Sequence, residues 1–128
     1  MRRKEAREYA VLKAFEIDAN HDWESDISSY IGEEDLGNQL SYVKEVLSKV
    51  SGERDRIDSL INQVSDGWTT GRMAKTDLAI IRVACAEILY VDDVPKAVAI
   101  NEAVELAKKY GTDDSHRFIN AILGKVNV

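Results

Sequence analysis

The side chains that most often carry catalysis are few in this 128-residue chain, and they lie apart from one another. The only histidines, His21 and His116, fall in different predicted elements, so neither has an evident partner for proton transfer. Cys85 is the only cysteine and lies in a long apolar run, which favours a buried, unreactive thiol over a nucleophile. A lone cysteine also excludes an internal disulfide and favours a reducing, cytoplasmic setting. We therefore predict that the chain is not an enzyme.

The segment GWTTGRMAKT has the glycines of a phosphate-binding loop but not its spacing. Gly67 and Gly71 are too close together, Arg72 stands where a lysine is needed, and no predicted strand precedes the segment. The acidic pairs along the chain are typical of helix starts rather than of metal ligands. We expect no cofactor and no metal site.

Positive charge gathers at the start of the chain. Residues 1–13 contain five basic and two acidic side chains, although the formal net charge of the whole chain is −6. On a helix with 100° per residue, one third of the circumference holds a basic arc that ends in an aromatic ring: Arg3, Lys4, Arg7, Val11 and Phe15. Cations that follow phosphates and a ring for stacking suit single-stranded nucleic acid. The alternative is a solvated helix face with Phe15 packed in the core.

The size of this charge cluster limits what it can bind alone. Three neutralised phosphates on a single strand give a salt slope of roughly −2, which is a shallow electrostatic contribution. The rest of the chain is acidic and suits a basic partner. We therefore expect weak RNA binding by the isolated chain and stronger binding with a second protein.

The elements that must position these residues are predicted to be helices throughout, in a single all-α domain. Apolar residues recur with a period near 3.6, and no run alternates like a strand. No apolar segment is long enough to span a membrane without a charge. The predicted helices cover residues 3–18, 22–31 (short and weak), 34–50, 53–66, 75–91, 95–110 and 113–126.

The helices of the second half have the clearest signals. Thr76 is predicted as an N-cap, Pro95 as the start of the next helix and Gly111 as a left-handed cap at its end. The helix at 75–91 is apolar on nearly all sides, so we expect it to run through the middle of the core.

The segment DVPKAVAINEAVELAKKYGTDDSHRFINAIL closely resembles the signature of the NusB family of bacterial transcription antitermination factors, approximately DVP..VAINEAVELAK.YG…S.KFVNGVL. Upstream, DLAIIRVACAEILY is similar to the family's D.AILR.A.YEL, and Trp68 with Arg72 fits a W…R pair just before it. At the front, AREYAVLKAF resembles AR..A.Q.LY. The similarity covers the start and the second half of the chain, and residues of about 20–60 are variable.

The resemblance implies two stacked three-helix subdomains, at approximately 1–66 and 67–128. It also implies binding of boxA RNA together with the small-subunit ribosomal protein NusE. Through RNA polymerase and other Nus factors, that heterodimer would suppress premature termination, chiefly on ribosomal RNA operons. Some members of the family pair with themselves, so a homodimer is a further expectation.

The family's functional residues carry over only where motifs match. The resemblance implies Phe15 and Asp77 as contacts to NusE. Arg82 could instead be an ion-paired arginine of a core helix, and Phe118 could be plain core. The residues implied to contact RNA are Arg2, Arg3, Lys4, Arg7, Arg82, Asp114, Ser115 and Phe118.

The chain departs from the family pattern in three places. Glu5 stands where a basic residue is common, Phe15 replaces a tyrosine, and Ala121 stands where glycine is common. The first change favours an alternative function, a protein adaptor or homodimer whose RNA face is masked. A third possibility, an RNA-modifying enzyme, would need a catalytic half that this chain lacks.

Overall fold

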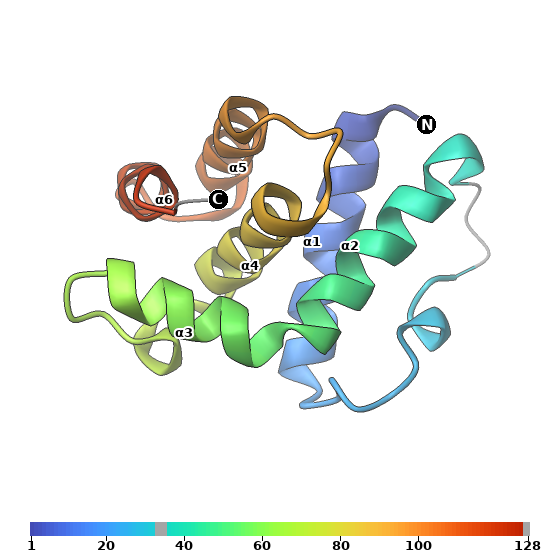
Figure 1. Ribbon diagram of the computed structural model, residues 1–128, viewed down its shortest axis with the longest axis horizontal. Helices are drawn as coiled ribbons and strands as arrows, with labels where there is room; N and C mark the ends of the chain where they lie inside the picture. Colours follow the sequence, from blue (N-terminus) through green and yellow to red (C-terminus); the bar gives the residue numbers. More distant parts are fainter. Residues whose placement is uncertain (33–35, 127–128) are drawn as a thin grey trace.

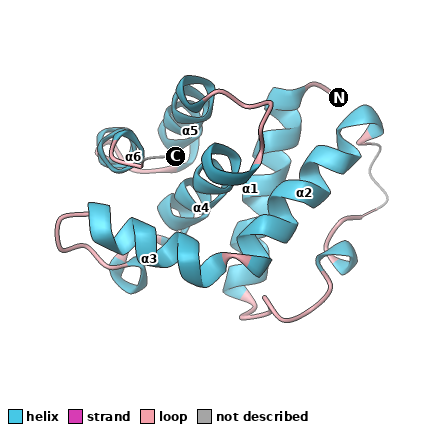
Figure 2. Cartoon of the chain, in the orientation of Figure 1, coloured by secondary structure: helices cyan, strands magenta, loops and turns pink. Residues whose placement is uncertain are grey.

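The computed structural model describes residues 1–32 and 36–126, and these form six α-helices, three short 3-10 helices and no strand (Figures 1 and 2). The all-α prediction is confirmed. The α-helices are α1 (Arg3–Ala19), α2 (Leu40–Gly52), α3 (Arg54–Val64), α4 (Lys75–Tyr90), α5 (Lys96–Tyr110) and α6 (Ser115–Gly124). The 3-10 helices are η1 (Ile27–Ser29), η2 (Gly37–Gln39) and η3 (Thr70–Arg72).

The variable middle of the chain is less helical than predicted. The weak helix at 22–31 shrinks to η1, a single turn that the Asp26 carboxylate caps by accepting a hydrogen bond from the Ser28 amide. The predicted helix start near residue 34 falls on residues 33–35, which lie outside the described residues. Regular α-helix begins at Leu40, directly after η2. Gly37, the first residue of η2, has a φ of +53°, which lies outside the α-helical range.

Two of the three predicted signals in the second half are wrong. Helix α4 begins at Lys75, so Thr76 is already inside it and Ala74 occupies the N-cap position. Gly111 ends α5 in an extended conformation, with φ −95° and ψ −169°, instead of the left-handed one. A glycine is needed there because a Cβ would meet the Ala107 carbonyl oxygen at 2.8 Å and the side chain of Ser115. Pro95 directly precedes the first residue of α5, as predicted.

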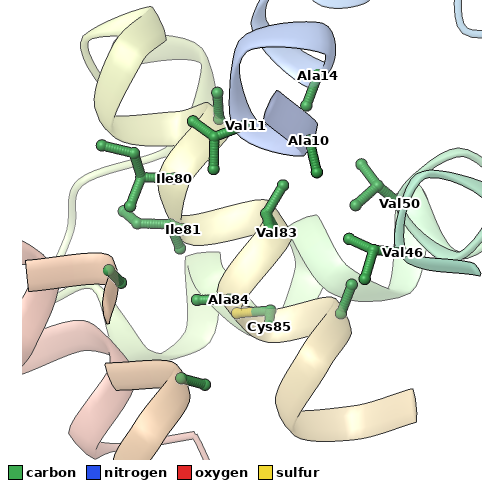
Figure 3. Packing of buried hydrophobic residues seen from close by; sticks show 14 of the residues in the cluster. Ala10, Val11, Ala14, Val46, Val50, Ile80, Ile81, Val83, Ala84 and Cys85 are labelled. Atoms are coloured by element: carbon green, nitrogen blue, oxygen red, sulfur yellow. The ribbon is translucent and has the colours of Figure 1, made fainter. Parts of the chain in front are cut away.

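Helix α4 runs through the middle of the molecule, as its apolar pattern predicts. It packs against α1, α2, α3, α5 and α6, and every residue from Asp77 to Ile88 is buried (Figure 1). In Figure 3, Val83 of α4 points toward α1, which carries Ala10, and Val46 of α2 lies on the same side of α4 as Ala10. Small side chains on α1 let the two helix backbones come close, which fixes how the N-terminal helix lies on α4.

Cys85 sits in this core and is completely buried. Burial raises the pKa of its thiol to about 12, and the negative charge of Asp58 acts in the same direction. The thiol therefore stays protonated at neutral pH, and the prediction of a buried thiol is confirmed.

The division into subdomains at 1–66 and 67–128 stays a prediction. Helix α4, from the second range, packs on α1, α2 and α3 of the first as well as on α5 and α6. None of the helices in the described ranges has the length and apolar character needed to cross a membrane. The same ranges hold no group of three or more side chains suited to a metal ion.

Candidate functional site

Arg7 lies in the protein interior instead of on an exposed basic arc. Its side chain is paired with Glu87 of α4, with 2.9 Å from Nε to Oε1 and 2.8 Å from Nη2 to Oε2. Arg7 is only 4% exposed, and Glu87 is fully buried. Burial opposes the charge of Arg7, but the hydrogen bond and the charge of Glu87 outweigh it and raise the pKa of the guanidinium. The expectation that Arg7 faces RNA phosphates is wrong, because this face of α1 packs against α4.

Arg3 lies at the surface but is held by its neighbours. Its Nε donates to Gln39 Oε1 at 2.7 Å, and its guanidinium carbon lies 4.2 Å from the centre of the Tyr42 ring. A weak ion pair joins it to Asp93, with 3.8 Å between Nη2 and Oδ2. Arg2 is more exposed and reaches Glu5 at 3.6 Å. A strand could therefore still reach Arg2 and Arg3, as well as the exposed Lys4.

Lys4 is exposed at the rim of a hollow of about 360 Å³ between α1 and α5. The hollow is lined by acidic and basic side chains, among them Glu8, Glu102, Glu105, Lys108 and Lys109. Within that hollow the Glu8 carboxylate accepts hydrogen bonds from Lys109 Nζ at 2.6 Å and from the Tyr110 hydroxyl at 2.9 Å. The Lys109 hydrogen bond holds the pKa of Glu8 below its ordinary value despite partial burial. The basic arc expected from the helical wheel is thus broken at Arg7, whereas Lys4 remains exposed.

Arg82 is an ion-paired arginine of the core, which is the alternative that the sequence left open. Its guanidinium binds Asp58 of α3 through two contacts of 2.8 and 2.9 Å and Asp18 of α1 at 3.1 Å. Burial would raise the pKa of Asp18, but a hydrogen bond from Trp23 and the charge of Arg82 outweigh it and lower that pKa. Arg82 therefore joins three helices, and the expectation that it faces RNA is wrong.

The remaining implied residues meet in one place, which we call the aromatic hollow. It has a volume of about 300 Å³ and lies where η3, the start of α4 and the start of α6 come together. It contains three of the residues implied for RNA and one of the two implied for the protein partner. The lining residues are Trp68, Arg72, Met73, Ala74, Asp77, Thr112, Asp114, Ser115 and Phe118.

Two aromatic rings form one wall of the aromatic hollow. Trp68 is 52% exposed, an unusual state for so large an apolar side chain. Its ring meets Phe118 edge to face, with centroids 6.2 Å apart and an interplanar angle of 77°. The guanidinium of Arg72 lies 5.9 Å from the centre of the Trp68 ring. Phe118 is therefore a wall of the hollow as well as a neighbour of the core.

Asp77 is the most unusual polar group in the aromatic hollow. It is 8% exposed, and its buried Oδ1 accepts no hydrogen bond from the residues that the structure describes. Its place in the first turn of α4 offers some stabilisation from the helix dipole. A buried polar atom without a partner is rare in folded proteins and often marks a site that is completed from outside.

Asp114 and Ser115 are already engaged at the rim of the aromatic hollow. The Ser115 hydroxyl accepts a hydrogen bond from the Thr112 amide at 2.9 Å, and the Ser115 amide donates to the Thr112 carbonyl. The Asp114 carboxylate accepts from Arg117 at 2.8 Å. Both residues therefore shape the turn before α6, and a phosphate contact there would have to displace or share these bonds.

A second surface feature is an apolar edge on α1, which we define as Leu12 and Phe15. They are 44% and 39% exposed, so the alternative that Phe15 packs in the core is wrong. Tyr110 of α5 is also exposed and reaches α1 through Glu8. Apolar side chains exposed side by side on one helix are typical of protein contact surfaces.

Sequence reasoning assigned no functional role to Trp68 and Arg72, although both fit the family pattern. The signal that could have found them is the position of a tryptophan among polar residues, GWTTGR, where burial is improbable. The sequence placed Leu12 in no site because one exposed leucine is ordinary.

Comparisons with known proteins agree with the fold. The model of the NusB family matches residues 4–127. The transcription antitermination protein NusB of Alkaliphilus oremlandii is 41% identical over 127 residues, covering 98% of this chain and 92% of that protein. The NusB protein of Acetivibrio thermocellus is 41% identical over 128 residues, covering 98% and 88%.

Solved structures agree as well. The structure of T. maritima NusB superposes with a TM-score of 0.89 at 27% identity, covering 98% of this chain and 89% of that one. The solution structure of NusB from Aquifex aeolicus gives a TM-score of 0.76 at 24% identity, covering 97% and 86%, and supports the fold alone.

Proposed function

Because the chain belongs to the NusB family of transcription antitermination proteins, we propose that it binds boxA RNA as a heterodimer with the ribosomal protein NusE. In this proposal the pair joins RNA polymerase and other Nus factors and acts chiefly on ribosomal RNA operons. The observation that carries the proposal is the aromatic hollow, where an exposed tryptophan, a second ring and an arginine lie together. Exposed rings beside a guanidinium suit the unstacked bases of single-stranded RNA.

In this proposal the RNA face has two parts. The aromatic hollow holds a base, and phosphates near the start of α1 contact Arg2, Arg3 and Lys4. Arg7 and Arg82 act indirectly, by fixing α1 and α3 on α4. With Arg2, Arg3 and Lys4 as the accessible cations at the start of α1, the electrostatic part of binding is small, and the isolated chain binds RNA weakly.

The proposed partner face is the apolar edge of α1. Leu12 and Phe15 offer apolar surface, and the chain's formal net charge of −6 suits a basic ribosomal protein. When this chain and the basic partner bind the same RNA together, the complex binds more tightly than either protein does alone.

A titration of labelled boxA RNA with and without NusE tests the proposal. We expect weak binding by the chain alone, and at least tenfold tighter binding when NusE is present at saturation. A scrambled RNA of equal length is the control. Equal affinities for boxA and the scrambled RNA, with NusE present, would refute the proposal.

Self-association is a second candidate, favoured by the exposure of Leu12 and Phe15 and by the burial of Arg7. In this alternative two copies cover each other's apolar edge, and the chain acts as an adaptor whose RNA face is masked. Light scattering from 1 to 200 μM chain separates the two proposals. A stable dimer that Phe15→Glu dissociates supports the adaptor, whereas a monomer over the whole range rejects it.

A further inference from the structure

We propose that Gln39 and Tyr42 hold Arg3 in the orientation in which it binds an RNA phosphate. This inference rests on the proposed RNA function and deepens it, because it names the residues that position one of the RNA contacts. Both residues lie in the variable middle of the chain, where the family resemblance implies no functional residue. Gln39 is the last residue of η2, and Tyr42 lies in the first turn of α2.

The first argument is the way in which Arg3 is held. Its Nε donates to Gln39 Oε1 at 2.7 Å, and its guanidinium carbon lies 4.2 Å from the centre of the Tyr42 ring. Gln39 is half-buried and Tyr42 is 4% exposed, so neither partner has the freedom of a fully exposed side chain. Because these contacts already restrict the rotamers of Arg3, a phosphate that binds the guanidinium costs less conformational entropy.

The second argument is the set of hydrogen-bond donors that these contacts leave free. A guanidinium has five N–H donors, and Gln39 uses only the one on Nε. The turn between α4 and α5 passes beside the start of α1 and brings Asp93 Oδ2 to 3.8 Å from Nη2, which is too long for a hydrogen bond (Figure 1). Within the described part of the chain, both Nη groups therefore keep their donors for a ligand. Two adjacent Nη groups match the bidentate geometry of a phosphate.

The third argument separates the ring of Tyr42 from its hydroxyl group. The hydroxyl is buried and has no hydrogen-bond partner among the described residues. Tyr42 therefore acts on Arg3 through the face of its aromatic ring, which attracts a guanidinium. The centre of the same ring lies 5.9 Å from the guanidinium of Arg7, which is paired with Glu87. The position of Arg3 is thus linked to the buried ion pair that joins α1 to α4.

A phosphate fits this site better than a carboxylate from a partner protein does. Arg2 and Lys4 flank Arg3 in the sequence and are both exposed, so a strand meets three cations together. Phosphates recur along an RNA strand and can use all three, whereas a single carboxylate cannot. The partner in the proposed function is a basic protein, which this cluster of positive charge would repel.

The test is a double-mutant cycle that measures the affinity of the full chain for labelled boxA RNA with NusE at saturation. Arg3→Ala should weaken binding about tenfold, because a charge-assisted contact to a phosphate is lost. Tyr42→Leu should weaken binding about fivefold, because the arginine remains but is no longer held. Since both changes remove the same contact, the double variant should match Arg3→Ala within about twofold. Tyr42→Phe keeps the ring and loses only an unpaired hydroxyl, so it should rescue the affinity to within about twofold of the unchanged chain.

Gln39→Ala tests the second support of Arg3 without a change in the core. We expect a loss of about threefold in affinity, and no further loss when Arg3 is already alanine. Asn38→Ala is the matched control, because Asn38 is the neighbouring exposed amide of η2, and this change should leave the affinity unaltered. Helicity and the melting temperature of all variants are measured first. If Tyr42→Leu does not fold, the comparison of Gln39→Ala with Asn38→Ala still decides.

The results separate this inference from the proposed function. If boxA binds with NusE present but Arg3→Ala, or both Gln39→Ala and Tyr42→Leu, bind as tightly as the unchanged chain, the inference is overturned and the proposed function stands. Equal losses with and without Arg3 would also overturn it, because the two residues would then act by another route. Loss of the NusE complex in these variants would assign the surface to the protein partner and overturn it too. If the unchanged chain with NusE binds boxA no better than a scrambled RNA, the proposed function and the inference both fail.

Discussion

The start of α1 and the aromatic hollow both contain residues that the sequence linked to RNA. The two regions differ in how far their side chains are exposed. At the start of α1, Arg7 is buried against Glu87, and Arg3 is half-buried against Tyr42 and Gln39. In the aromatic hollow, the large ring of Trp68 stays exposed, although apolar residues usually become buried. A basic residue in the sequence, such as Arg7, therefore does not always place a positive charge at the surface. The exposed ring of Trp68 is therefore the feature on which the proposed RNA site rests.

The largest expected effect tests the burial of Arg7 at the start of α1. Arg7→Ala leaves the Glu87 carboxylate buried without its partner, which should lower the free energy of unfolding by about 3–5 kcal/mol. Urea unfolding followed by circular dichroism measures this loss. The basic arc expected from the sequence would instead place Arg7 at the surface, where its loss would cost little stability.

The double variant Arg7→Met with Glu87→Leu is the control for that prediction. It removes both charges and keeps an apolar fill, so it should recover most of the lost stability. A stable Arg7→Ala chain with weakened RNA binding would restore the exposed basic arc and reverse our reading of α1.

The next effect tests the second half of the comparison. Trp68→Ala should weaken RNA binding by about 1–3 kcal/mol, the range that one base–aromatic stack contributes. Its effect on stability should be small because the ring is half exposed. Leu40→Ala, at an exposed apolar residue of α2, serves as the control and should leave RNA affinity unchanged. Unchanged RNA affinity in Trp68→Ala would remove the aromatic hollow from the RNA face.

A smaller effect concerns the ion pairs that hold α1 and α3 on α4. The pKa of Asp18 is lower in the folded chain than its ordinary value of 3.8, so its charge contributes stability above that value. This contribution is lost as the pH falls through the folded pKa. We expect the free energy of unfolding to drop from pH 5 to pH 2, and Asp18→Asn to drop less over that range. Parallel pH profiles for the two chains would contradict the assignment.

The smallest expected effect tests whether the exposed Arg2 at the start of α1 contacts an RNA phosphate. Arg2→Ala should leave stability unchanged, because its ion pair with Glu5 is highly exposed. If Arg2 neutralises one phosphate, the slope of log affinity against log salt should fall by about 0.7. An unaltered slope would mean that the strand does not reach the start of α1.

The sequence predicts the helices well because each one depends on a local period of apolar residues. It could not separate Arg3 from Arg7, which share one face of α1, because the partner of Arg7 is Glu87, far along the chain. It assigned Gly111 to the wrong conformation for a similar reason, since the close contact with Ser115 forms only when α6 folds back. The aromatic hollow joins three separate segments, so no local pattern could reveal it.

The length of helix α4 sets the distance between the two ends of the proposed RNA face. Asp77 lies in its first turn, and beyond its last residue, Tyr90, the chain reaches Asp93, the ion-pair partner of Arg3. At 1.5 Å per residue, Asp77 and Tyr90 are about 20 Å apart along the axis. An oligonucleotide too short to cover that distance can occupy only one end, so affinity should rise stepwise with RNA length once both ends are engaged.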